Sequence, residues 1–107
     1  MVYYKDTALT DLLNLLDGLI EWQTDNGQRR LEYETALSYF NDLKNAFDEI
    51  DTLFYHSKAT YPAHKRYGEY VYRYERNSRT SWYACYDISE GIIVINRIIS
   101  NYLNIEN

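Results

Sequence analysis

The stretch 69–88, "EYVYRYERNSRTSWYACYDI", decides the fold, because the spacing of large side chains changes there from a helical to a strand period. Every second residue from 70 to 74 is a tyrosine, and 82–88 alternates in the same way. Side chains two residues apart share one face of a strand. Two strands joined by the turn "RNSR" at 76–79 are therefore expected to be antiparallel.

Downstream, "SEG" (89–91) forms the next turn and "GIIVINRIIS" (91–100) the next strand. This strand is apolar on both faces, which predicts that it is the most buried strand of the sheet. Arg97 interrupts its apolar run. An unpaired charge is costly when buried, so Arg97 should point to an open edge or face, or pair with Asp87 or Glu75.

Upstream, "MVYYKD" (1–6) has the aromatic and β-branched residues typical of a strand. Leucines at three- and four-residue spacing predict a helix over 6–23, with Asp6 or Thr7 as its cap. "TDNGQ" (24–28) is a turn, and a second helix is expected over about 31–54. The predicted apolar stripes are Leu9, Leu12, Leu13, Leu16, Leu19 and Ile20 in the first helix, and Tyr33, Leu37, Phe40, Leu43, Phe47, Ile50 and Phe54 in the second.

The expected fold is one α+β domain spanning 1–107. It has an N-terminal strand, an antiparallel helical hairpin and a three-strand antiparallel meander that forms a small sheet. Residues 55–65 should form a loop. Because the hairpin can cover only one face of the sheet, the other face should be available for function.

The net charge of −5 argues against general nucleic-acid binding, which depends on phosphate neutralisation. The charge is uneven: 1–60 contain 11 acidic and 5 basic residues, whereas 61–107 contain 5 and 6. A site for a polyanion should therefore lie in the second half. Lys65 and Arg66 form a small basic cluster there, and Arg73 alternates with tyrosines that can stack on bases or simply pack.

No metal or cofactor is expected. The one cysteine, Cys85, has no histidine at metal spacing, and neither a glycine-rich phosphate loop nor a Ser-His-Asp arrangement is present. One cysteine also excludes an internal disulfide. With no membrane-spanning run and no signal peptide at the N-terminus, these features favour the cytoplasm.

In element order, the chain resembles the RelE/ParE superfamily of bacterial toxin components. The phrases "YVYRYERN", "TSWYACYDI" and "GIIVINRI" look like the three C-terminal strands of that family. The resemblance implies the toxin of a type II toxin–antitoxin (plasmid-stabilisation) module, with a cognate antitoxin as its partner. It leaves open whether the chain also forms a homo-oligomer.

The ribonuclease branch of the family cuts mRNA on the ribosome without a metal, using basic residues and a tyrosine or histidine. The candidate catalytic residues implied here are Arg97, Tyr102 and Arg73, and the candidate RNA-binding residues are Lys65, Arg66, Arg76 and Arg79. Ribosome-dependent members are usually basic, whereas this chain has a pI near 4.9. Two alternatives therefore stay open: a ParE-like inhibitor of DNA gyrase that is not a nuclease, and a non-catalytic partner-binding module that kept the fold.

Overall fold

The computed structural model describes residues 1–23, 29–75 and 80–100. The elements follow in the order β1 (Val2–Tyr4), α1 (Asp6–Gln23), α2 (Arg29–Asp48), the 3-10 turn η1 (Ile50–Thr52), α3 (Pro62–Lys65), β2 (Tyr70–Glu75), β3 (Ser81–Ser89) and β4 (Ile92–Ser100). The predicted α+β class and the N-terminal strand are confirmed. The predicted turns at 24–28 and 76–79 lie outside the described residues.

The four strands form one mixed sheet in the order β1-β4-β3-β2. Strands β2, β3 and β4 are antiparallel neighbours, as expected from their connections. The first strand, β1, joins this meander in parallel on the outer side of β4, with Val2 opposite Ile93 and Tyr4 opposite Ile95. The sheet is therefore not the purely antiparallel meander predicted. The helical hairpin returns the chain to the end of the sheet where β1 begins, with Asp51 beside the N-terminus, so β2 and β4 run in the same direction as β1.

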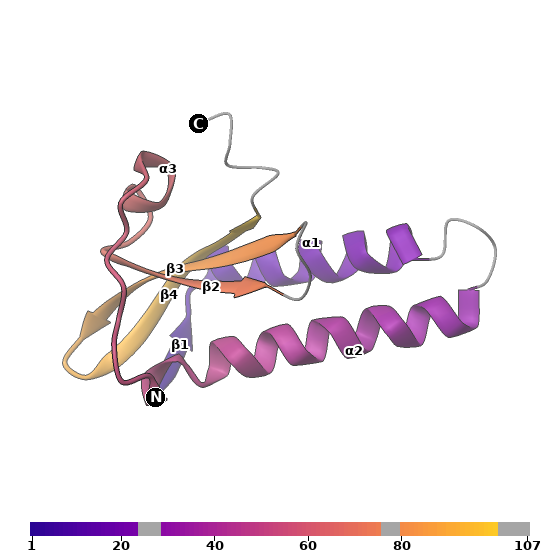
Figure 1. Ribbon diagram of the computed structural model, residues 1–107, viewed down its shortest axis with the longest axis horizontal. Coiled ribbons are helices and arrows are strands. Elements are labelled where there is room, and N and C mark those ends of the chain that lie inside the picture. Colours follow the sequence, from indigo (N-terminus) through magenta and orange to yellow (C-terminus); the bar gives the residue numbers. More distant parts are fainter. Residues whose placement is uncertain (24–28, 76–79, 101–107) are drawn as a thin grey trace.

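The two helices α1 and α2 lie side by side and antiparallel, and their far ends extend beyond the strands (Figure 1). They cover one face of the sheet. The core between the two helices and the sheet consists of Ala8, Leu12, Leu15, Tyr39, Leu43, Phe47, Ile50, Ala84, Tyr86, Ile93, Ile95 and Ile98. The hairpin and the sheet thus share a single hydrophobic core, the arrangement that buries one face of each.

The tyrosines of β2 face α2. Tyr72 meets Phe47 edge to face with ring centroids 6.1 Å apart, and Tyr74 meets Tyr39 in the same way at 6.4 Å. The indole N–H of Trp82 donates to the hydroxyl of Tyr39 over 3.1 Å. Edge-to-face contacts of this kind contribute beyond their buried area. The alternating aromatics of the decisive stretch therefore pack against the hairpin and do not form an open stacking surface.

The helical stripes differ from those predicted. On α1 the fully buried positions are Ala8, Leu12 and Leu15, whereas Leu9 and Leu13 are 44% and 64% exposed. The leucines of α1 cover a wider arc than its packing uses, so spacing alone did not identify the buried subset. The second helix ends at Asp48, and Phe54, which lies beyond it, is fully exposed.

The second face of the sheet is not left open as predicted. Residues 57–59 pair alongside the start of β2, through Val71 N–H to the Ser57 carbonyl and Ala59 N–H to the Glu69 carbonyl, each 2.9 Å. Residues 60–68, including α3, then fold back over the strands. The ring of His64 lies 4.5 Å from that of Tyr83, on the face of β3 opposite the core. Among the described helices, none is long and apolar enough to cross a membrane.

Candidate functional site

A β-bulge decides which way Arg97 points. Cys85 pairs with Arg97 and Tyr86 pairs with Ile95, so Asn96 is an extra residue in β4. Strict alternation would have placed Arg97 on the core face with Ile93 and Ile95. The extra residue moves Ile98 onto the core face and directs Arg97 to the other side. Bulges commonly re-aim a side chain in this way.

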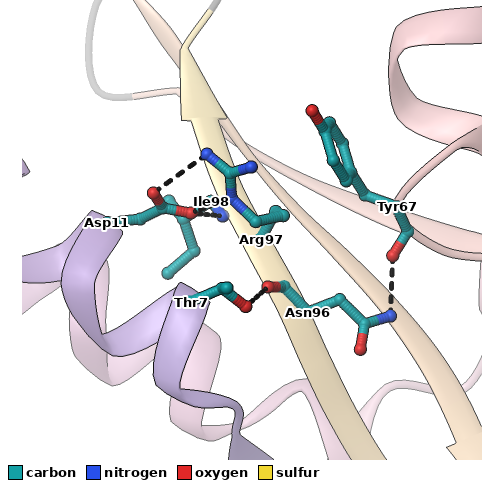
Figure 2. Close-up of polar contacts among 6 residues, drawn as sticks. All are labelled: Thr7, Asp11, Tyr67, Asn96, Arg97 and Ile98. Atoms are coloured by element: carbon teal, nitrogen blue, oxygen red, sulfur yellow. Dashed lines mark hydrogen bonds and ion pairs between the residues drawn. The ribbon is translucent and has the colours of Figure 1, made fainter.

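Side chains of α1 form hydrogen bonds with the backbone of β4 beyond the point where β1 ends. Strand β1 pairs only as far as Ile95, so the later backbone groups of β4 need other partners. The Thr7 hydroxyl donates to the Asn96 carbonyl over 2.7 Å, and Asp11 Oδ2 accepts from the Ile98 N–H over 2.8 Å (Figure 2). Thr7, predicted as a possible helix cap, is therefore bonded to the sheet.

The same Asp11 carboxylate binds Arg97. Arg97 Nε lies 2.7 Å from Asp11 Oδ2, and Nη2 lies 3.2 Å from Oδ1. The Asp11 side chain is 13% exposed and that of Arg97 is 32% exposed. The hydrogen bond to Asp11 raises the pKa of Arg97 above its ordinary value. The predicted pairing of Arg97 with Asp87 or Glu75 was therefore wrong.

The ring of Tyr67 lies next to the guanidinium of Arg97, with 4.8 Å between the guanidinium carbon and the ring centroid. Arg66 approaches the same ring at 5.9 Å. The Tyr67 backbone is held by Asn96, whose Nδ2 donates to the Tyr67 carbonyl over 2.6 Å and to Asp87 Oδ2 over 2.9 Å. We call Asp11, Arg66, Tyr67, Asn96 and Arg97 the Arg97 cluster. Its residues come from α1, from β4 and from the segment that follows α3.

Close contact fixes Tyr67 above the sheet. A Cβ atom on the next residue, Gly68, would lie 2.7 Å from the backbone nitrogen of Tyr86. Only glycine fits at this distance, so the chain can pass directly over β3. The N–H of Glu69 then donates to Asp87 Oδ1 over 2.9 Å. The Oδ1 atom of Asn96 is buried without a hydrogen-bond partner within the described parts of the chain.

The predicted site residues that the structure describes do not form one group. Arg73 is exposed on β2, where its Nη2 lies 2.9 Å from Glu75 Oε2 and its Nε lies 3.1 Å from Ser81 Oγ. Strand β3 lies between β2 and β4, and Arg73 is level with Ile99, so Arg73 and Arg97 are separated by at least about 10 Å. Lys65 and Arg66 are exposed on and just after α3. Arg76, Arg79 and Tyr102 lie outside the described residues.

Sequence reasoning missed Asp11, Tyr67 and Asn96. Asp11 is one of several acidic residues of α1, and nothing in its spacing marks it as the partner of a residue 86 positions later. The bulge that makes Asn96 an extra residue is also invisible in the pattern. The dipeptide Tyr67-Gly68 is the one local signal, since a glycine before a strand suggests close backbone approach.

The chemistry available to the Arg97 cluster is limited. It offers a guanidinium already paired with a carboxylate, a second guanidinium at Arg66 that no carboxylate of the described residues pairs with, and a tyrosine ring. No group of three or more potential metal ligands occurs in the described ranges. The arrangement can bind an anion or a polar partner surface, and within the described residues no nucleophile is hydrogen-bonded to a base there.

Comparison with known proteins gave no match: no protein-family model, no curated protein and no solved structure is similar to the chain.

Proposed function

We propose that the protein is the toxin component of a bacterial type II toxin–antitoxin module with a RelE/ParE-like fold, and that it arrests growth by binding a protein target without cutting RNA. The element order supports the toxin part of the proposal. A strand, a helical hairpin and three antiparallel strands in about 100 residues are the features on which the resemblance rests. DNA gyrase is the target that the resemblance implies for a non-nuclease member.

One observation carries the choice of branch. Both arginines described on the sheet face opposite the hairpin, Arg73 and Arg97, are paired with carboxylates of this same chain. Phosphoryl chemistry needs a cation that is available for the charge of the transition state. Arg97 is held by two hydrogen bonds in a partly buried place, so releasing it for phosphate would leave Asp11 uncompensated. The acidic pI of about 4.9 supports the same choice.

Ribosome-dependent mRNA cleavage is the second candidate. The observation that favours it is the ring of Tyr67, which is approached by both Arg66 and Arg97, at 5.9 and 4.8 Å. Tyr67 is partly exposed, and arginines around an accessible aromatic ring are a common way to bind single-stranded RNA. In this candidate Arg66 is the phosphate-binding residue, because no carboxylate pairs with it within the described ranges.

The test is induction in a bacterial host that lacks the antitoxin, with growth, transcript integrity and DNA supercoiling followed together. The proposal predicts growth arrest with intact transcripts and altered supercoiling. Arg66→Ala should leave the arrest unchanged. The matched control Lys5→Ala, which changes an exposed lysine between β1 and α1, should do the same.

Fragmented transcripts that disappear with Arg66→Ala but persist with Lys5→Ala would instead establish the ribonuclease. No arrest at equal soluble expression would count against a toxin and favour a partner-binding module. Arg97→Ala is a poor probe by itself, because it removes a structural ion pair as well as a possible phosphate ligand.

A further inference from the structure

The first helix, α1, carries apolar surface that the described residues of the chain leave exposed. Leu9 and Leu13 lie one turn apart and are 44% and 64% exposed. The buried side of the helix, centred on Leu12 and Leu15, is a separate stripe that already packs in the core. Single exposed leucines are ordinary, whereas Leu9 and Leu13 are neighbours on the helix and form one continuous apolar strip.

This surface is bracketed by carboxylates. Asp6 precedes Leu9 by three residues and Asp17 follows Leu13 by four, so the four side chains lie along one line of the helix. Asp6 and Asp17 are exposed, and no ion pair among the described residues includes either of them. The sequence of α1 contains no lysine or arginine. We call Asp6, Leu9, Leu13 and Asp17 the α1 strip.

We propose that the α1 strip docks an amphipathic helix of a partner protein that has two apolar residues flanked at both ends by lysine or arginine. Asp6 and Asp17 are eleven residues apart, which is about 16 Å along the helix axis. A partner helix with basic residues about three turns apart would match both carboxylates while its apolar side chains cover the leucines. The inference goes beyond the proposed function and does not depend on it.

Charge decides against a second copy of this chain. A copy would bring its own Asp6 and Asp17 against the same carboxylates, and like charges placed together disfavour a wrong partner. The leucines should supply most of the affinity, because apolar burial dominates association. The exposed carboxylates should contribute mainly selectivity and salt dependence.

The probe is a synthetic helical peptide with Lys, Leu, Leu and Lys at positions i, i+4, i+7 and i+11 on an alanine-rich background. A control peptide has Glu in place of both lysines. Binding to the full chain is measured by fluorescence anisotropy at low and at physiological salt. Four proteins are compared: wild type, Leu13→Gln, the double variant Asp6→Asn/Asp17→Asn, and Glu34→Gln, which changes an exposed carboxylate on α2.

The wild type should bind the lysine peptide and discriminate against the glutamate peptide. Leu13→Gln should weaken binding by about ten-fold or more, as expected for an interface anchor. The double variant should lose the discrimination and most of the salt dependence, and Glu34→Gln should bind like wild type. Circular dichroism of each variant checks that the fold is retained, which is expected because all changed side chains are exposed.

Absence of binding by the lysine peptide would overturn the proposal, as would equal binding to wild type and Leu13→Gln. Equal loss in Glu34→Gln would also overturn it, since the effect would then be general charge. Sedimentation of the protein without peptide is the last check. A wild-type dimer that Leu13→Gln converts to a monomer would assign the strip to a second copy and contradict the proposed occupant.

Discussion

Asp11 and Arg97 are joined by two hydrogen bonds of 2.7 and 3.2 Å across 86 residues of sequence. The same carboxylate accepts from the N–H of Ile98 over 2.8 Å, so it completes the edge of β4 beyond the end of β1. Arg97 thus ties α1 to the central strand of the sheet. Its main role in this structure is to hold the hairpin and the strands together.

Asp11→Ala should lower the free energy of unfolding by about 1–3 kcal/mol, measured by urea denaturation. The substitution removes the partner of a partly buried guanidinium and leaves the Ile98 N–H unpaired. The estimate stays at this level because the Arg97 side chain is still 32% exposed and solvent compensates part of the loss. The control Asp17→Ala, on the exposed side of the same helix, should change stability by no more than about 0.5 kcal/mol. Equal effects of the two substitutions would contradict a structural role for Asp11.

Two glycines should respond to alanine in opposite directions. Gly68→Ala places a Cβ 2.7 Å from the Tyr86 nitrogen and 2.8 Å from its carbonyl oxygen, so residues 60–68 must move away from β3. We expect a loss of about 1–3 kcal/mol, typical of overpacking. Gly18 lies inside α1 with nothing within 4 Å of an added Cβ, and Gly18→Ala should stabilise by about 0.5–1 kcal/mol. Thermal unfolding of both variants measures the difference, and a neutral Gly68→Ala would show that the segment does not need this close approach.

Stability should fall as the pH drops through 6.5, in part because of His64. Burial lowers the pKa of His64 below its ordinary value of 6.5, and the ring packs against Tyr83 and Tyr61. The unfolded chain therefore binds the proton first, and the stabilisation present above pH 6.5 is lost as the pH falls toward the lower folded pKa. His64→Phe keeps an aromatic ring there and should flatten the dependence of the urea midpoint between pH 7.5 and 5.5. An unchanged slope would assign the dependence to other groups.

Cys85 should resist thiol reagents in the native protein. It is fully buried in β3, and burial raises the pKa of its thiol to about 12. Because the thiolate is the reactive form, labelling should require unfolding. The reaction of native and urea-unfolded protein with a chromogenic disulfide reagent measures this. Rapid stoichiometric labelling without urea would show that β3 is more accessible than the structure indicates.

The period of the sequence predicted the elements well, because each element has a strong local pattern. The alternation over 70–74 and 82–88 reflects a half-buried strand, and the leucine spacing of 6–23 reflects an amphipathic helix. The parallel pairing of β1 with β4 was not predicted, because it depends on the path of the hairpin and not on local spacing. Similarly, the loop predicted over 55–65 contains the short helix α3, which begins at Pro62, and proline is common at the first position of a helix.

The site was less predictable than the fold. Arg97 was recognised as unusual because it interrupts an apolar strand, but its direction depends on the bulge at Asn96 and its partner lies on α1. Both are tertiary features that leave no local pattern. Tyr67 and Gly68 lie between a proline-containing segment and a strand, where composition predicts only a connection.

The most direct test of the central claim is to add the purified protein to translating ribosomes and map new 5′ ends on the mRNA. The proposed function predicts that no new 5′ ends appear beyond those of a buffer control. It also predicts that expression of the same protein in cells without an antitoxin arrests growth. Codon-specific cleavage that is lost with Arg66→Ala would contradict it and establish a ribonuclease whose phosphate site includes the Arg97 cluster.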